Sequence, residues 1–429
     1  MSRKRRAAAA AVRPAVLVAV AVAAVLGTRL PGRAVDLEVY RTAGAVWRAG
    51  RPLYGAGYPF GLGIYLPFTY PPFAALLLGL SSLLPSPVAV ALVSSGSLLA
   101  LGVAARLSAE AAGLARPWAR WPLPVVAALG VLAVALEPVR FTLYFGQVNL
   151  VLMAAVTADT LVRRPRWPRG VLIGLAAAVK LTPLAFLLVL VCRHQWRACA
   201  TAVVTFVAAH LLGAVLLPAD SRDYWLGGVL TSPGRIGAAD TATNQSLRGV
   251  LARAWPEAPS AVWVGLVLVM GVLTAVATWR RTHRGDDLGA LLATAAGGLL
   301  VSPVSWTHHW VWVVPALAWL LARARRVSAA AHRLTWAGAA AWAVPALVAA
   351  VFVVAPADLL PAGDGREQHW VWWQHLIGDA YVWLGLAALV AASFAGPRPA
   401  RQRTADEATT TSEASTQAVD GSAGTRIPR

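Results

Sequence analysis

Long apolar runs recur along the whole chain, and short clusters of basic residues separate them. Each run is about 20 residues long, the length of a helix that crosses a lipid bilayer. Because the bilayer core offers no water to unpaired backbone groups, such runs must form helices. The pattern predicts an all-α integral membrane protein, a polytopic bundle of about 10–12 transmembrane helices. The first run, residues 14–30, resembles a signal peptide, but the apolar runs after it favour an uncleaved helix.

The basic clusters assign a side to each end of these helices. Positively charged residues concentrate in cytoplasmic loops, so we expect the clusters on that side. The clusters occupy residues 3–6, 106–120, 163–169, 193–197, 280–284 and 323–326. The outside segments are then 31–72, 137–147, 218–260, 303–309 and 357–375. We therefore predict a multi-pass protein of the cell membrane whose suggestive polar residues, and active site, lie on the extracytoplasmic side.

Two segments do not fit a simple count of crossings. Residues 73–107 must cross once although Pro85 and Pro87 divide them, so they form either one long broken helix or a short piece followed by a span. Residues 170–192 lie between two basic clusters. Either one cluster violates the rule, or the segment dips into the membrane and returns as two half-helices, which is tolerated where it is buried in protein or lines a cavity.

Composition supports a membrane protein and argues against a nucleic-acid partner. Hydrophobic residues make up 58% and charged residues 13% of the 429 residues, whereas soluble domains carry about 25% charged residues. The net charge of +19 comes from the loop clusters and so reports topology. Cys192 and Cys199 match no metal-binding spacing. We expect residues 1–395 to form the membrane domain and residues 396–429, which lack apolar periodicity, a disordered cytoplasmic tail.

Asp36 comes directly after the first predicted helix, at the level of the lipid headgroups. A carboxylate there can accept the proton of a substrate hydroxyl as a general base. The alternative is an interfacial aspartate that caps a helix. The loop that follows is about 40 residues long and contains Tyr40 and Tyr70. Long ordered loops are usually functional, although aromatic residues also form belts at membrane interfaces.

Three further polar residues enter apolar runs. Gln147 and Asn149 need partners inside the bundle, so they make either a helix-packing hydrogen bond or a substrate contact. Lys180 is an ionisable residue at membrane depth, which is costly and indicates function. It can pair with a lipid phosphate, or its long side chain can reach back to the cytoplasmic face.

The later outside segments add six candidates for substrate binding. Arginine's planar fork suits phosphate, so Arg235 and Arg248 are candidate anion binders, and Asn244 and Gln245 lie between them. His308 and His309 are adjacent, so on a helix their side chains diverge by about 100° and rarely hold one metal ion. We expect hydrogen bonds to a phosphate or sugar hydroxyl instead; interfacial belt residues are the alternative.

The chain contains no phosphate-binding loop, no dinucleotide motif and no serine hydrolase elbow. It therefore offers no site for a soluble nucleotide. An enzyme of this kind must draw on an activated group that is already in the membrane.

Several short motifs occur in an order that resembles a known family. They are Asp36-Leu37-Glu38-Val39-Tyr40, Tyr70-Pro71-Pro72-Phe73, Gly146-Gln147-Val148-Asn149, Lys180-Leu181-Thr182-Pro183 and residues 302–309. The combination resembles glycosyltransferase family 87, the actinobacterial mannosyltransferases that use polyprenol-phosphate-mannose and have the GT-C fold.

The resemblance implies an inverting transfer of mannose from a polyprenyl-phosphate-linked sugar donor to a lipid-linked glycan acceptor, with an α-1,2 linkage on phosphatidylinositol mannosides or a lipoglycan. Asp36 matches the catalytic carboxylate. Lys180, Arg235, Arg248 and one of His308 and His309 would stabilise the phosphate charge. Neither a metal nor another cofactor is expected, and the expected partners are the donor, the acceptor and membrane lipids. The alternatives are transfer of another sugar, such as arabinofuranose, and transport of a lipid-linked sugar.

Overall fold

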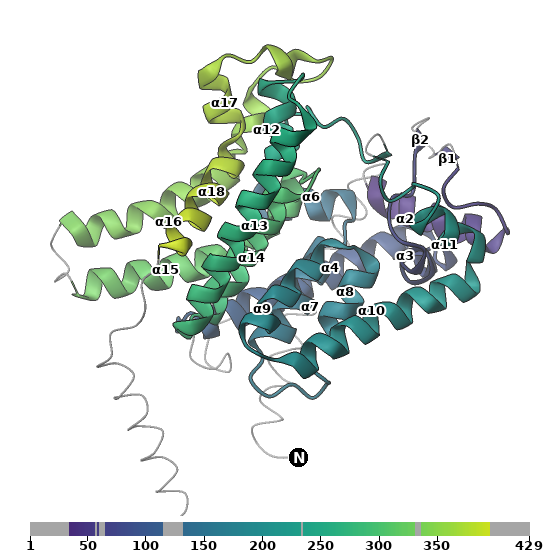
Figure 1. Cartoon of the computed structure of the whole chain (residues 1–429), viewed down its shortest axis with the longest axis horizontal. Coiled ribbons are helices and arrows are strands. Elements are labelled where there is room, and N and C mark those ends of the chain that lie inside the picture. Colours follow the sequence, from purple (N-terminus) through teal and green to yellow (C-terminus); the bar gives the residue numbers. More distant parts are fainter. Residues whose placement is uncertain are drawn as a thin grey trace, which may run out of the picture.

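The computed structural model describes residues 34–55, 58–59, 65–114, 132–232, 235–330 and 336–394. The predicted first helix and the predicted tail lie outside these residues. The described part is built almost entirely of helices (Figure 1). Its strands are confined to the short hairpin of β1 (Tyr58–Pro59) and β2 (Tyr65–Leu66). The predicted all-α class is therefore confirmed.

The helices follow one another along the chain with short connections. The α-helices are α2 (Val35–Arg48), α3 (Pro72–Leu78), α4 (Ser86–Ala111), α6 (Glu137–Phe145), α7 (Asn149–Leu161), α8 (Val171–Val179), α9 (Leu187–Cys192), α10 (Trp196–Leu216), α11 (Pro218–Trp225), α12 (Leu247–Ala254), α13 (Ser260–His283), α14 (Asp287–Val301), α15 (Val313–Ala330), α16 (Trp336–Val354), α17 (Trp372–Gly378) and α18 (Ala380–Ser393). The 3-10 helices are η1 (Gly79–Leu83), η3 (Thr182–Phe186), η5 (Thr307–Trp312), η6 (Pro356–Leu359) and η7 (Arg366–His369).

Within the described ranges, three helices are long and apolar enough to cross a membrane: α4, α10 and α13. Two bent pairs pass the same test together, namely α6 with α7, bent by 118°, and α17 with α18, bent by 72°. Counting each pair as one span gives five, and four shorter apolar helices accompany them. Breaks at glycine and proline keep these shorter helices below the length of a full span. The predicted number of spans stays a prediction.

The basic clusters meet at one end of the bundle. Arg193, after α9, donates to the Thr160 carbonyl in the last turn of α7 (2.7 Å) and pairs with Asp287 at the start of α14 (2.7 Å). Arg280 at the end of α13 donates to the last residue of α18, Ser393 (2.6 Å). Helix ends that carry arginine therefore lie together, as the charge pattern predicts.

The predicted outside segments meet at the opposite end. The backbone N–H of Leu53 donates to Asp220 (2.7 Å), which joins the first segment to the third. Thr142 donates to the His308 carbonyl (3.1 Å), which joins the second to the fourth. Gln368 of the fifth donates to Asp240 (2.6 Å). Segments from residue 34 to residue 379 thus build one layer of loops and short helices over the bundle.

The segment 170–192 enters the bundle and returns, as the second of the two predicted alternatives states. The N–H of Gly170, at its start, donates to Asp159 (2.9 Å), and Arg193, just after its end, reaches Thr160. Both ends therefore lie at the last turn of α7. Between them, α8 rises over nine residues, about 13 Å, to Lys180, whose extended backbone interrupts the helix. η3 and α9 then lead back.

The segment 73–107 also breaks at its prolines. α3 and η1 form a short piece, Pro85 is extended, and α4 begins at the next residue as a separate helix of 26 residues. The short piece packs tightly against α2, because a Cβ on Gly44 would lie 2.3 Å from the Gly79 carbonyl oxygen. The two glycines let α2 rest directly on η1, which fixes the position of the helix that carries Asp36.

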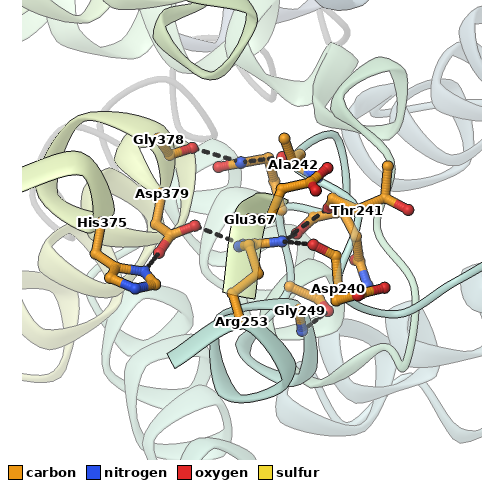
Figure 2. Close-up of polar contacts among 12 residues, drawn as sticks. Asp240, Thr241, Ala242, Gly249, Arg253, Glu367, His375, Gly378 and Asp379 are labelled. Atoms are coloured by element: carbon orange, nitrogen blue, oxygen red, sulfur yellow. Dashed lines mark hydrogen bonds and ion pairs between the residues drawn. The ribbon is translucent and has the colours of Figure 1, made fainter. Parts of the chain in front are cut away.

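A buried ion pair holds the loop layer together (Figure 2). Arg253 at the end of α12 and Asp379 before α18 are 2.5 Å apart, and both side chains are fully buried. The other guanidinium nitrogen of Arg253 donates to backbone carbonyls of residues 240, 241 and 244. One side chain therefore ties the third outside segment to the last one.

Replacing Arg253 with methionine is expected to destabilise the protein by about 3–5 kcal/mol, because Asp379 would stay buried without its cation. Thermal unfolding in detergent measures the effect. The matched control is Arg222→Gln, which removes the exposed arginine of α11 from the same layer and should change stability by less than about 0.5 kcal/mol. Equal stability of the two variants would contradict the role of the ion pair.

Candidate active site

Asp36 lies in the first turn of α2, an amphipathic helix that is not among the candidate spans. Its carboxylate accepts a hydrogen bond from Gln147 and lies within the electrostatic reach of Lys180. Burial raises the pKa of Asp36 to about 6, although the Gln147 hydrogen bond and the Lys180 charge both oppose this rise. A carboxyl group with this pKa is deprotonated at neutral pH and has more affinity for a proton than an exposed aspartate, which suits a general base.

Gln147 connects Asp36 to two tyrosines. The hydroxyls of Tyr40 and Tyr70 donate to Gln147 Oε1 at 2.9 and 3.1 Å, and the two hydroxyls are 3.0 Å apart. Since the amide oxygen accepts both tyrosines, the amide nitrogen is the atom that donates to Asp36. These four side chains come from α2, the first loop and the α6–α7 turn, so three separate segments fix the carboxylate.

Gly146 aims Gln147 at this position. α6 ends at Phe145, and Gly146 adopts a left-handed conformation with φ of 69° that side chains other than glycine rarely adopt. A Cβ on Gly146 would also lie 2.7 Å from the Leu37 Cβ. The turn therefore requires glycine both for its backbone angles and for the contact with α2.

Lys180 stands at the apex of the 170–192 segment and its ammonium faces the site. Its Nζ is 3.1 Å from Asn149 Oδ1 and 3.1 Å from His309 Nε2, and it lies 5.6 Å from the centre of the Tyr70 ring. The alternative that the side chain reaches back to the cytoplasmic face is wrong, because these partners all belong to the opposite side of the apex from the basic clusters. The ammonium is held by neutral groups near one carboxylate, that of Asp36.

The two histidines have different positions. The rings of His308 and His309 are 4.7 Å apart and nearly perpendicular. The ring of His309 meets Lys180, whereas His308 contributes its carbonyl oxygen, which accepts from Asn149 Nδ2 (3.1 Å) and Thr142. Among the described residues, no group of three or more histidine, cysteine, aspartate and glutamate side chains has the spacing of a metal site.

A cavity opens beside the ammonium group of Lys180. It encloses about 600 Å³ up to its open mouth. Polar groups line one part, namely Asn149, Lys180, Thr182, Ser302, Ser305 and His309. Apolar side chains line the rest, including Leu152, Met153, Val156, Phe186, Leu299 and Trp312. The cavity thus offers a cation with hydrogen-bonding groups at one end and an apolar lining at the other, which suits an amphiphile with an anionic head.

The other four predicted binding residues lie away from this cluster. Arg235 donates to the carbonyls of Tyr54 and Phe68 (3.3 and 3.4 Å), so it holds the first loop just before Tyr70. The Arg248 guanidinium lies over the Trp263 ring, 5.7 Å from its centre. Asn244 and Gln245 are buried and bond to backbone groups of residues 239, 242, 303, 305 and 378. These contacts organise the loop layer, and substrate binding by the four residues stays a prediction.

The sequence reasoning did not single out the hydroxyl groups of the cavity. Thr182 follows Lys180 by two residues, and Ser302 and Ser305 precede the histidines. All three belong to stretches that contain a candidate residue, so the same motifs carried the signal.

Comparisons with known proteins agree with this arrangement. The model of glycosyltransferase family 87 matches residues 68–303. The polyprenol-phosphate-mannose-dependent alpha-(1-2)-phosphatidylinositol mannoside mannosyltransferase of Mycobacterium tuberculosis is 39% identical over 386 residues, which cover 83% of this chain and 84% of that protein. The protein of the same name from Mycolicibacterium smegmatis is 37% identical and covers 85% of both chains.

A solved structure is also similar, that of ArnT from Cupriavidus metallidurans bound to undecaprenyl phosphate. It is 17% identical with a TM-score of 0.40, over 88% of this chain and 76% of that one.

Proposed function

The chain belongs to glycosyltransferase family 87, and we propose that it transfers a mannosyl residue from polyprenyl-phosphate-mannose to a phosphatidylinositol mannoside or a related lipid-anchored mannoside. The single observation that carries the proposal is that a carboxylate and an ammonium, Asp36 and Lys180, lie in one polar cluster beside a partly apolar cavity. The first supplies a base for an acceptor hydroxyl and the second a cation for a leaving phosphate.

The transfer needs one base and one stabilised leaving group. The acceptor hydroxyl oxygen attacks the anomeric carbon of mannose while its proton moves to the Asp36 carboxylate. The bond from that carbon to the phosphate oxygen breaks, and the electron pair leaves with polyprenyl phosphate. Attack from the face opposite the leaving group inverts the anomeric centre, so a β-linked donor gives an α-mannoside.

The leaving group gains one negative charge as the bond breaks. Lys180 with its partners His309 and Asn149 offers positive charge and hydrogen bonds where this charge develops, which is how preorganised groups lower a barrier. The apolar part of the cavity, around Leu152 and Phe186, suits the first isoprene units of the donor. Tyr40, Tyr70 and Gln147 hold the base in place and line the approach to it.

The proposed active site lies outside the cytoplasm. The basic clusters gather at the other end of the bundle, and such clusters stay cytoplasmic. A lipid-linked donor suits this location because it needs no soluble nucleotide.

The test is an assay of the purified full-length protein with radiolabelled polyprenyl-phosphate-mannose and a phosphatidylinositol mannoside. We expect labelled acceptor that α-mannosidase releases as mannose. The corresponding arabinofuranosyl donor serves as the control for sugar identity. Label from that donor alone would assign a different sugar to the same fold, and movement of the donor across vesicles without transfer would indicate a transporter.

A further inference from the structure

A second cavity lies at the end of the bundle where the basic clusters meet. It encloses about 910 Å³ up to its open mouth. Its lining includes three arginines, two histidines and a single acidic residue: Arg163, Arg169, Arg193, His194, His283 and Asp287. Clusters that lie far apart in the sequence therefore surround one cavity, and its charge is predominantly positive.

The arginines of this cavity are held in fixed positions. Arg169 donates to carbonyls at the end of α7, among them that of Val162 (2.6 Å). Arg193 donates to the Thr160 carbonyl and pairs with Asp287, and only 9% of its side chain is exposed. The buried Arg193 Nε has no hydrogen-bond partner among the described residues. A preorganised guanidinium with a spare donor is well suited to a phosphate.

Two tryptophans place this cavity at the level of the lipid headgroups. Trp196 lies beside His194, with ring centres 6.0 Å apart, and is 58% exposed. Trp279 lies beside His283, with ring centres 4.5 Å apart, and is 51% exposed. Exposed tryptophan is typical of the interface between membrane and water. Because both rings border the same cavity, headgroups of surrounding lipids lie within its reach.

We propose that this cavity binds the phosphate of an anionic membrane lipid. Cationic cavities between helices on the cytoplasmic side are suited to such headgroups, and the Arg163 side chain is exposed at this one. The lipid would contact Arg169 at the start of α8 and Arg193 after α9. It would therefore clamp together both legs of the segment whose apex carries Lys180, about 13 Å away along α8.

The experiment titrates the full-length protein in detergent with dioleoylphosphatidylglycerol and, separately, with dioleoylphosphatidylcholine, and counts bound lipids by native mass spectrometry. We expect a tight site for phosphatidylglycerol. Arg163→Gln should weaken that site about fivefold, since an arginine near an anionic lipid surface contributes about 1 kcal/mol. Arg163 is exposed, so this variant should fold normally.

Arg164→Gln is the matched control, because it removes the same charge from an exposed neighbour that does not line the cavity. It should leave the affinity for phosphatidylglycerol unchanged. Equal weakening by both variants, or equal affinity for phosphatidylcholine, would overturn the proposal in favour of a diffuse surface charge. Displacement of the lipid by millimolar inorganic phosphate would also overturn it and assign the cavity to a soluble anion.

Discussion

Asp36→Asn is expected to reduce mannosyl transfer by about 10²–10⁴-fold, the range that a general base contributes. Asparagine has nearly the same shape, and its side-chain oxygen still accepts the Gln147 hydrogen bond, but it cannot take a proton from the acceptor. Folding and donor binding should therefore change little. The measurement is kcat in the radiolabel assay, together with equilibrium binding of the polyprenyl phosphate.

Glu38→Gln provides the control for loss of a carboxylate from the same helix. Glu38 pairs with Arg41 (3.2 Å) and accepts from Ser86 (2.6 Å), so it faces α4 and its preceding loop and not the site. Its activity should stay within about threefold of wild type, since exposed ion pairs contribute about 0–1 kcal/mol. Full activity of Asp36→Asn, or equal losses in the two variants, would contradict a base at Asp36.

The pH dependence of the wild-type enzyme follows from the same residue. Its pKa of about 6 means that the base is available above that pH and is progressively protonated below it. We therefore expect kcat/KM to reach a plateau above about pH 6 and to fall about tenfold for each pH unit below it. The residual rate of Asp36→Asn should lack this fall, because no carboxylate titrates there.

The arrangement of this protein was predictable from sequence where it depends on a pattern along the chain. Basic clusters on both sides of residues 170–192 were enough to predict, as one of two alternatives, a segment that returns to its starting side. The prolines at 85 and 87 likewise marked the start of α4. Both inferences use the distribution of charge and the missing N–H of proline, which act locally.

The contacts that make the site could not be predicted in the same way. The tyrosine hydroxyls reach Gln147 across 107 and 77 residues of sequence, and this contact needs the left-handed turn at Gly146 and the packing of α2 against it. Arg248 illustrates the opposite error of interpretation, because arginine suits a phosphate and an aromatic ring equally well. Only the position of Trp263 reveals which partner it contacts.

Lys180→Met is expected to reduce transfer by about 10²–10³-fold, the cost of removing one preorganised group that stabilises transition-state charge. Methionine fills the space of most of the lysine side chain but leaves the leaving phosphate without its cation. Lys180→Arg keeps the charge and should retain more activity than Lys180→Met. Wild-type rates in both variants would show that the ammonium serves only the packing of the hairpin apex.

The same variant should give a second result that a packing role would not produce. Lys180 lowers the pKa of Asp36 through its positive charge, so its removal leaves burial less opposed and the pKa rises above about 6. The pH at which the residual kcat/KM reaches half of its plateau should therefore move to higher pH in Lys180→Met and stay near the wild-type value in Lys180→Arg. Measured from about pH 5 to about pH 9, an unchanged midpoint in Lys180→Met would mean that the two charges do not act on each other, and that the ammonium and the base belong to separate sites.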